Sequence, residues 1–350
     1  MNRIKKICFF EISRPLRTLF STSLGKKSSM RSVIVKVILD NDDFSLGEVP
    51  TSFVLKHETI PAIMAVLTAI APRFSGLPVE EYKDKIAGLR KEYFNMSMTI
   101  SGFEMALFRA WLKCKKVSEH QYWGGKLRRL ETDITIPFIT KVPPLEKWIR
   151  YILKKDFKTY KLKVSGDVKA DLQILSRVYR LLQDSLEHFT VRIDGNQGYT
   201  PKTFLEMIKL IEKNKFKIEL FEQPLPKNDY TGLKYIKHRS PVPIILDETV
   251  FCSRDLQMVI DQDLADGVNI KFAKSGIAES EKMIRMAKQN NLKLMIGCMT
   301  ETMVGLSAGI YCAAGSGKFD YVDLDGVYFL HHRDVYDRIR IDGPEFVIEK

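Results

Sequence analysis

The chain has 350 residues, 45% of them hydrophobic and 28% charged, which excludes an intrinsically disordered protein and allows a barrel-sized domain with an addition. The formal net charge is +12, and the excess lies in residues 1–160, which hold 28 Lys and Arg against 16 Asp and Glu, whereas the remainder holds 27 of each. No stretch approaches the about 18 uncharged apolar residues of a membrane-spanning helix, so we expect no membrane partner.

The five cysteines are widely spaced, at Cys8, Cys114, Cys252, Cys298 and Cys312. They show no zinc-type spacing, and their odd number favours the reducing cytoplasm. The basic N-terminal half leaves a nucleic-acid-binding protein as an alternative, because basic residues surround Trp111, Tyr122 and Trp123 within Arg109–Arg129. The same pattern is typical of the solvated face of a helix, and we favour that interpretation.

The first third of the chain predicts a sheet followed by helices. Three apolar or alternating stretches are predicted strands: Ile4–Ile12, Arg31–Leu39 and Phe44–Val49. Three stretches with helical periodicity follow: Ile60–Ile70, Val79–Tyr93 and Met98–Lys113. The polar, glycine-containing segment Thr18–Met30 is expected to be a mobile loop. This order predicts an α+β domain over residues 1–125.

From residue 126 to about residue 330 the pattern changes to an alternation of strands and helices. Eight strands are predicted: Asp133–Phe138, Tyr160–Val164, Thr190–Asp194, Ile218–Glu222, Pro243–Asp247, Gly267–Lys271, Leu292–Gly297 and Tyr321–Asp325. Helices between them include Lys169–Leu186, Pro201–Lys213, Ser253–Asp261 and Glu279–Gln289. The alternation predicts a (β/α) barrel. An open doubly wound sheet is the alternative, but its usual Gly-x-Gly-x-x-Gly turn is missing.

Charged residues stand near the ends of the predicted barrel strands, at Lys161, Lys163, Asp194, Glu222, Asp247, Lys271, Asp323 and Asp325. The C-terminal ends of barrel strands converge on one mouth, so these residues are expected to be neighbours. A charge at the end of an apolar strand is costly to desolvate unless it is paired or binds an ion, which predicts a functional site. Asp194, Glu222 and Asp247 offer hard oxygen ligands from three consecutive strands, which suits Mg²⁺. A helix N-cap is the alternative for each one alone.

The lysines are expected on two sides of this mouth. Lys161 and Lys163 lie two residues apart on one strand and share its inward face. Lys271 ends the sixth strand, so it is expected to face Lys163, on the second strand, across the barrel. A solvent-facing pair is the alternative for Lys161 and Lys163. Opposed amines beside a metal site are suited to proton transfer.

Together these motifs resemble the muconate-lactonising branch of the enolase superfamily. The motifs are Lys161-Leu162-Lys163, Asp194-Gly195-Asn196-Gln197-Gly198, Glu222-Gln223-Pro224-Leu225, Asp247-Glu248, Asn269-Ile270-Lys271 and Gly297-Cys298-Met299-Thr300-Glu301. Within that branch, Asp323-Leu324-Asp325 is similar to the Asp-x-Asp pair of dipeptide epimerases of the L-Ala-D/L-Glu type. The resemblance extends over essentially the whole chain. It implies a modified (β/α)7β TIM-like barrel with an α+β capping domain and residues 331–350 returning toward the cap.

The resemblance implies a cytoplasmic, Mg²⁺-dependent dipeptide epimerase in which Asp194, Glu222 and Asp247 bind the metal. Lys163 and Lys271 would act as base and acid on opposite faces of the α-carbon of the dipeptide's C-terminal residue. That carbon would be inverted by a 1,1-proton transfer through an enediolate. The substrate would be a small dipeptide, for example one derived from peptidoglycan, with no nucleic acid or membrane partner, and a homo-oligomer is left open.

Further roles are implied for residues around the metal. Lys161 would add electrostatic stabilisation, and Asp323 and Asp325 would pair with the substrate's α-ammonium group. A cycloisomerase, an N-acylamino acid racemase or an o-succinylbenzoate synthase of the same superfamily is the alternative. Their substrates have no free ammonium group, which would leave the two acids unpaired. Cys298 would line the pocket wall.

The segment Thr18–Met30 is expected to contact the substrate's side chains. Alanyl-glutamate epimerases usually carry an arginine there, and counting back from Ser32 places Gly25 at that position, followed by Lys26 and Lys27. Either lysine could replace the arginine as a monodentate partner for a carboxylate, and solvated loop lysines are the alternative.

Overall fold

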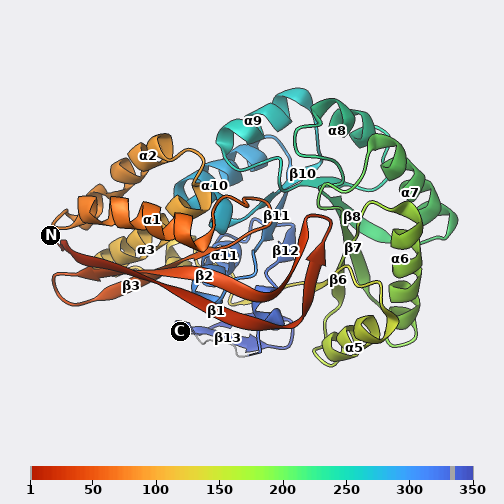
Figure 1. Ribbon diagram of the computed structural model, residues 1–350, viewed down its shortest axis with the longest axis horizontal. Coiled ribbons are helices and arrows are strands. Elements are labelled where there is room, and N and C mark those ends of the chain that lie inside the picture. Colours follow the sequence, from red (N-terminus) through yellow and green to blue (C-terminus); the bar gives the residue numbers. More distant parts are fainter. Residues whose placement is uncertain (1, 332–335, 350) are drawn as a thin grey trace.

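The computed structural model describes residues 2–331 and 336–349 and consists of a cap and a barrel (Figure 1). The cap sheet is antiparallel, in the order β1 (Ile4–Thr22), β2 (Gly25–Leu39) and β3 (Phe44–Pro50). The cap helices are α1 (Ile60–Ile70), α2 (Tyr82–Glu92), α3 (Ser97–Lys115) and α4 (Glu119–Tyr122), with 3-10 turns at Ala71–Phe74 and Val79–Glu81. The strands and helices predicted for this part of the chain are confirmed, although β1 and β2 are longer than expected.

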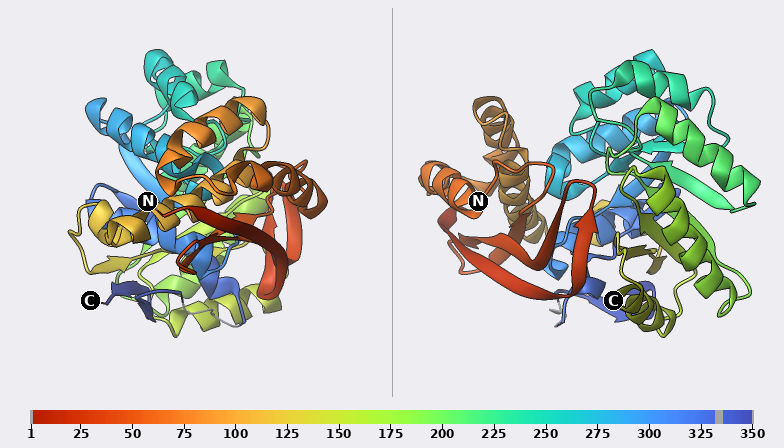
Figure 2. Two further views of the ribbon diagram at one scale, coloured as in Figure 1. Left: turned by 90° about the vertical axis from the view of Figure 1, so that its left-hand side faces the viewer. Right: turned by 45° about the vertical axis from the view of Figure 1, so that its right-hand side comes forward.

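Residues 18–30, predicted as a mobile loop, are instead the end of a long β-hairpin. β1 and β2 continue through this segment, with Phe20 opposite Lys27, and the ladder is interrupted between Pro15 and Phe20. Cross-strand pairing and the packing of Phe20 on Phe329, at 5.3 Å between ring centroids, order a segment whose polar composition favours a loop. The hairpin extends from the cap to the barrel (Figures 1 and 2).

Helix α3 is the centre of the interface between the cap and the barrel, and most of its residues are buried. It lies against β3 at a close approach of two glycines. A Cβ atom added to Gly47 would lie 2.1 Å from the carbonyl oxygen of Gly102, so a larger residue would push the helix from the sheet. The other side of α3 packs against α10 of the barrel.

Eight parallel strands follow in consecutive order. They are β5 (Ile134–Ile136), β6 (Thr159–Lys163), β7 (Thr190–Asp194), β8 (Ile218–Glu222), β9 (Ile244–Leu246), β10 (Gly267–Ile270), β11 (Lys293–Gly297) and β12 (Tyr321–Asp323). This order is that of a barrel and excludes the doubly wound sheet, whose strand order reverses. The two end strands meet where the Asp133 N–H donates to the Val322 carbonyl at 3.2 Å. The predicted (β/α)7β barrel with an α+β cap is therefore confirmed.

The barrel helices are α5 (Val142–Leu153), α6 (Val168–Gln183), α7 (Pro201–Lys213), α8 (Tyr230–Lys237), α9 (Ser253–Gln262), α10 (Phe272–Gln289) and α11 (Met303–Ser316), and a 3-10 turn at Gly326–Phe329 follows β12. Helices α5 to α9 each bury one apolar face against the strands. Every residue of α11 is buried, because this helix lies between the barrel and the cap. Over residues 2–331 and 336–349, no helix combines the length and apolarity needed to cross a membrane.

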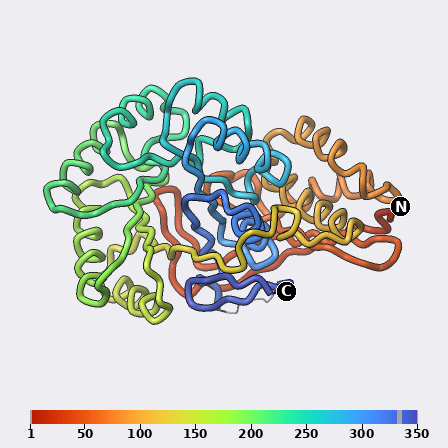
Figure 3. The backbone as a smooth tube through the Cα atoms, turned by 180° about the vertical axis from the view of Figure 1, so that it is seen from behind, coloured from red at the N-terminus to blue at the C-terminus, as the bar shows by residue number. Residues whose placement is uncertain are grey.

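The C-terminal segment forms a second small sheet with the link between the two parts. β13 (Ile339–Asp342) and β14 (Glu345–Ile348) pair as a hairpin, and β14 also pairs with β4 (Arg129–Glu131). Figure 3 shows this blue hairpin beside the yellow link. The Arg109 guanidinium of α3 lies 5.1 Å from the ring centroid of Tyr336, so the segment also contacts the cap.

Buried carboxylates of the cap bind the N-terminal ends of barrel helices. Glu48 of β3 accepts hydrogen bonds from the Thr302 N–H and hydroxyl and from the Gly305 N–H, at 2.6–3.1 Å. Glu104 of α3 accepts from two successive N–H groups of α10 at 3.0 and 3.1 Å, beside the kink at Gly276. A carboxylate stabilises a helix N-terminus by satisfying its free N–H groups. These contacts fix the cap on α10 and α11, with the hairpin over the barrel mouth.

Candidate active site

A cavity lies at the C-terminal ends of the barrel strands, beside the β1–β2 hairpin. The cap residues that line it are Phe20, Thr22, Leu24, Lys27, Thr51, Ser52, Phe53 and Val54. The barrel residues with charged or sulfur-containing side chains are Lys161, Lys163, Asp247, Glu248, Lys271, Lys274, Cys298, Met299, Asp323 and Asp325. Of the other predicted site residues, Asp194 and Glu222 lie directly behind this wall, in contact with Lys163 and Lys161.

One side of the cavity is formed by β6 and the strands after it. The Lys163 ammonium donates to Asp194 at 2.6 Å. The Lys161 ammonium donates to Glu222 at 3.2 Å and also contacts Asp323. All five of these side chains are buried. Both lysines point into the barrel because they are two residues apart on β6, and side chains alternate between the two faces of a strand. The predicted inward orientation of both lysines is therefore what the structure shows.

The opposite side of the cavity is formed by β10 and the start of α10. The Lys271 ammonium lies 2.7 Å from one carboxylate oxygen of Asp247, and Lys274 donates to the other at 2.5 Å. β10 is the fourth strand from β6 in a ring of eight, so Lys163 and Lys271 lie on opposite sides of the cavity. The Asn269 amide donates to Glu222 at 2.7 Å and connects the two sides.

Crowding of like charges in this buried site disturbs its titration. Burial and repulsion by Asp194 raise the pKa of Glu222 to about 7. Burial and repulsion by Asp247 raise the pKa of Glu248 to about 8. Burial alone would raise the pKa of Asp247 as well, but two neighbouring lysines hold it below its usual range. Burial would lower the pKa of Lys271, but attraction to Asp247 raises it above the usual value. Burial and repulsion between carboxylates therefore favour the neutral forms of Glu222 and Glu248, whereas Asp247 is kept ionised by its lysines.

The predicted ligands Asp194, Glu222 and Asp247 fit a divalent cation by their chemistry. They offer buried carboxylate oxygens from the ends of three neighbouring strands, and a cation between them would relieve the repulsion that raises the pKa of Glu222. One oxygen of Glu248 is also buried without a hydrogen-bond partner within the described part of the chain. In the structure each of the three pairs with a lysine, so their role as ligands stays a prediction.

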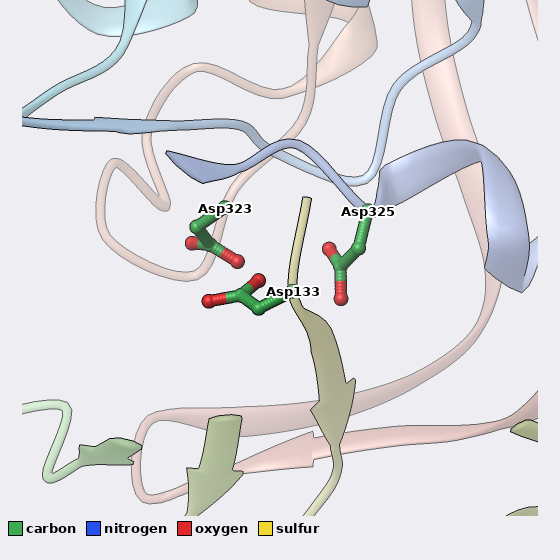
Figure 4. A group of neighbouring side chains, drawn as sticks. All are labelled: Asp133, Asp323 and Asp325. Carbon is green, nitrogen blue, oxygen red and sulfur yellow. The ribbon is translucent and has the colours of Figure 1, made fainter. Parts of the chain in front are cut away.

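A second group of carboxylates lies at β12 and the start of β5, next to Lys161. Asp323 and Asp325 belong to the end of β12 and the turn after it, and Asp133 lies next to them (Figure 4). One oxygen from each lies within 4.8 Å of the others. The Thr135 N–H donates to Asp325 at 2.6 Å, and the Cys298 sulfur lies 3.8 Å from the same carboxylate. Burial and repulsion by Asp323 raise the pKa of Asp325 to about 6. A cation beside the group would relieve this repulsion.

Only one of the two adjacent lysines on β2 of the hairpin lies in the cavity. Alternation along β2 turns Lys27 into the cavity, whereas Lys26 is exposed and is not among the described residues that line it. The geometry therefore favours Lys27 over Lys26 as the lysine that contacts the substrate, and the contact stays a prediction. Burial lowers the pKa of Lys27 to about 8. A Cβ atom on Gly25 would lie 2.8 Å from the Phe53 ring, which fills the space beside that glycine.

The aromatic residues that suggested nucleic-acid binding belong to the core of the cap. Trp111, Tyr122 and Trp123 pack against Phe108, with ring centroids 6.3, 4.9 and 6.5 Å from it. Rings held in such a cluster are not available for stacking on bases. The packing therefore favours the interpretation of this region as a helix with a solvated face, followed by a loop.

Reasoning from the sequence missed Lys274 and the pair of Asp133 and Arg192. Lys274 lies one helical turn after Lys271, and that spacing was the available signal. Asp133 lies just before β5, at the N-terminal end of the strand, whereas the residues of the barrel mouth are expected at the C-terminal ends. It meets Asp323 because tilted barrel strands are staggered against one another, which the linear sequence does not display.

The fold and this site define a capped (β/α)-barrel enzyme. The domain family described as Enolase C-terminal domain-like matches residues 145–347, more than half of the chain. The chain therefore belongs to the enolase superfamily, as its motifs predicted.

Similar proteins narrow the class further. The aromatic dipeptide epimerase of Herpetosiphon aurantiacus is 30% identical over 93% of this chain and 91% of its own length. A substrate-liganded complex of the L-Ala-D/L-Glu epimerase from Bacillus subtilis has a TM-score of 0.91 and 28% identity, with coverage of 99% and 96%. A dipeptide epimerase from Enterococcus faecalis V583, complexed with Mg and the dipeptide L-Leu-L-Tyr, has a TM-score of 0.90 and 25% identity, with coverage of 99% and 98%. The resemblance to dipeptide epimerases, which are isomerases, is confirmed.

Proposed function

We propose that this protein is a Mg²⁺-dependent dipeptide epimerase that inverts the α-carbon of the C-terminal residue of its substrate. The observation that carries the proposal is the placement of Lys163 and Lys271 on opposite sides of one cavity. An acid pair, Asp323 and Asp325, lines the same cavity. The similarity to dipeptide epimerases over nearly the whole chain supports the same reaction.

The metal would be held by Asp194, Glu222 and Asp247. When bound, Mg²⁺ supplies a positive charge that binds the substrate carboxylate and stabilises the negative charge developing there as the α-proton leaves. Lys161, buried between Glu222 and Asp323, adds a second positive charge on the same side of the cavity. Burial would lower the pKa of Lys161, but these carboxylates outweigh it and raise that pKa, so the residue stays an ammonium.

The two opposed lysines exchange one proton each with the substrate. As a neutral amine, Lys163 takes the α-proton from one face, and the Lys271 ammonium donates a proton to the opposite face. The product differs from the substrate only in configuration, and the roles reverse for the other epimer. The Phe20 ring, with its centroid 5.6 Å from the Lys163 nitrogen, covers this amine and limits access of water.

The acid pair favours a substrate with a free amino group. An α-ammonium group between Asp323 and Asp325 would neutralise buried carboxylates that otherwise repel each other. A cycloisomerase, N-acylamino acid racemase or o-succinylbenzoate synthase substrate would leave this repulsion in place. The structure therefore favours a dipeptide over the substrates of these alternatives.

The cap wall combines Phe20 and Phe53 with the Lys27 amine, which lies 5.5 Å from the Phe53 ring centroid. An aromatic ring thus fills the space beside Gly25, where alanyl-glutamate epimerases are expected to carry an arginine. This wall suits a bulky apolar side chain, and Lys27 adds a partner for an acidic one.

Solvent deuterium exchange tests the proposal. A library of L,L-dipeptides is incubated with the protein and Mg²⁺ in D₂O, and mass spectrometry should show one deuterium at the α-carbon of the C-terminal residue. Lys163→Ala and Lys271→Ala should each abolish net inversion, whereas Lys158→Ala, an exposed lysine just before β6, should leave it unchanged. Inversion retained in either active-site variant would contradict the two-lysine mechanism.

A further inference from the structure

Asp133 has no role in the proposed mechanism. It is 1% exposed, just before β5, and is not among the described residues that line the cavity. One oxygen of Asp133 and one of Asp323 are buried without a hydrogen-bond partner, as far as residues 2–331 and 336–349 are concerned. Figure 4 shows the Asp133 carboxylate directed toward Asp323, with Asp325 on the other side of the Asp133 backbone. An unpaired buried oxygen is costly, so its retention needs an explanation.

The charges around these three carboxylates do not balance. Arg192 of β7 donates to Asp133 at 2.7 Å, and Lys161 of β6 contacts Asp323. Among residues 2–331 and 336–349, two cations therefore face three acids. Both cations are also shared, Lys161 with Glu222 and Arg192 with Glu219. With all three acids ionised, the negative charge of the group therefore exceeds the positive charge by at least one.

The titration of the group shows that its full negative charge is unfavourable without a further cation beside it. Burial and repulsion by Asp323 raise the pKa of Asp133 well above its usual range, and Arg192 reverses only part of that shift. The same two causes raise the pKa of Asp325. A further cation entering beside the group would relieve the repulsion.

We propose that Asp133 is a positioning residue for recognition of the substrate's α-ammonium group, supplying a third carboxylate charge beneath the Asp323 and Asp325 side chains that the ammonium contacts. This inference rests on the proposed function and assigns a part in it to a residue outside the cavity wall. It makes the charge of the whole group, and not only the two acids in contact, the feature that selects a free amine over an N-acyl substrate.

Calorimetric binding with a matched pair of ligands tests the inference. The first ligand is L-alanyl-L-phenylalanine or L-alanyl-L-glutamate, whichever binds the unaltered protein more tightly with Mg²⁺. The second ligand is the same molecule with hydrogen in place of the ammonium group, that is, the C-terminal amino acid carrying an N-propionyl group in place of the alanyl residue. Asp133→Asn should weaken binding of the dipeptide about tenfold or more, because it removes one negative charge from a buried group whose carboxylate oxygens lie within 4.8 Å of one another. Binding of the propionyl analogue should not change.

Two further variants separate charge from folding. Glu219→Gln removes the other partner of Arg192, a carboxylate that is 36% exposed. It should weaken binding of the dipeptide much less than Asp133→Asn does and leave the propionyl analogue unchanged. Combining Asp133→Asn with Arg192→Gln removes one acid and one cation, so it restores the charge excess and should recover the affinity lost in the single variant. The double variant also keeps the test valid if Asp133→Asn alone destabilises the fold.

Several results would overturn the inference. Dipeptide affinity retained in Asp133→Asn would do so, and so would an equal loss for both ligands, which would indicate a structural role only. A smaller number of bound Mn²⁺ ions per chain in Asp133→Asn than in the unaltered protein would show that the group holds a metal instead. If the unaltered protein binds neither dipeptide, the proposed function fails first and this inference with it.

Discussion

The attachment of the cap by Glu48 gives a prediction about stability that can be worked from individual hydrogen bonds. The Glu48 carboxylate is 0% exposed and belongs to β3 of the cap, whereas its partners Thr302 and Gly305 begin α11 of the barrel. Replacing it by alanine leaves two backbone N–H groups and one hydroxyl without an acceptor at a buried helix N-terminus. It also removes a negative charge that stabilises the positive, N-terminal end of the helix dipole.

Each of these three groups costs about 1–3 kcal/mol when it is buried and unpaired. Water entering the space of the deleted carboxylate recovers part of that cost, so Glu48→Ala is expected to lower the free energy of unfolding by about 3–6 kcal/mol. This is a large share of the total stability of about 5–15 kcal/mol that is typical of a folded protein. Glu48→Gln keeps one acceptor oxygen and should lose less.

Urea unfolding followed by circular dichroism measures the loss, and proton exchange with a dipeptide measures its effect on the site. Because α11 follows the loop that contains Cys298 and Met299, which line the cavity, turnover in Glu48→Ala should fall at urea concentrations below its main unfolding transition. The exposed Glu80 of the cap provides a control, since Glu80→Ala should leave both measurements unchanged. A loss below about 1 kcal/mol in Glu48→Ala would refute the reasoning that this carboxylate satisfies buried donors.

Two other predictions concern pH and metal. Burial lowers the pKa of Lys27 to about 8, so its positive charge is lost as pH rises through that value, and the KM for L-alanyl-L-glutamate should rise above pH 8 while that for L-alanyl-L-phenylalanine should not. Steady-state assays of Lys27→Met should show no such difference, and the same slope for both dipeptides in the unaltered protein would argue against a charged contact. Removal of Mg²⁺ by a chelator should abolish deuterium uptake and lower the unfolding temperature, with Mg²⁺ restoring both. Exchange that persists in the chelator would contradict a metal requirement.

The barrel and its charged mouth were predictable because the signals are local. Short apolar strands, each followed by a helix, specify the alternation, and a charge at the end of such a strand falls at the mouth of any barrel. Lys163 and Asp194 could therefore be placed near each other from the sequence, and they form an ion pair at 2.6 Å. The roles of Asp194, Glu222 and Asp247 as metal ligands are a separate matter and stay a prediction.

The hairpin was not predictable in the same way, because its order depends on partners far away in the chain. Phe20 packs on Phe329, about three hundred positions later, and the segment 18–30 by itself has the composition of a loop. Without a strand over this segment, nothing in the sequence distinguishes Lys26 from Lys27. Once β2 is known to begin at Gly25, alternation alone separates the two side chains.

The division of labour between the two parts of the molecule has a consequence for specificity. The residues proposed to move the proton, Lys163 and Lys271, belong to the barrel, whereas the wall offered to the side chain, with Lys27 and Phe53, belongs to the cap. Glu48 connects the cap to α11. The cap wall is therefore held beside the two lysines by a contact that includes neither the lysines nor the residues of the wall. Substitutions in the hairpin or at Phe53 can therefore change which dipeptide is preferred without altering the lysines, provided that this attachment is preserved.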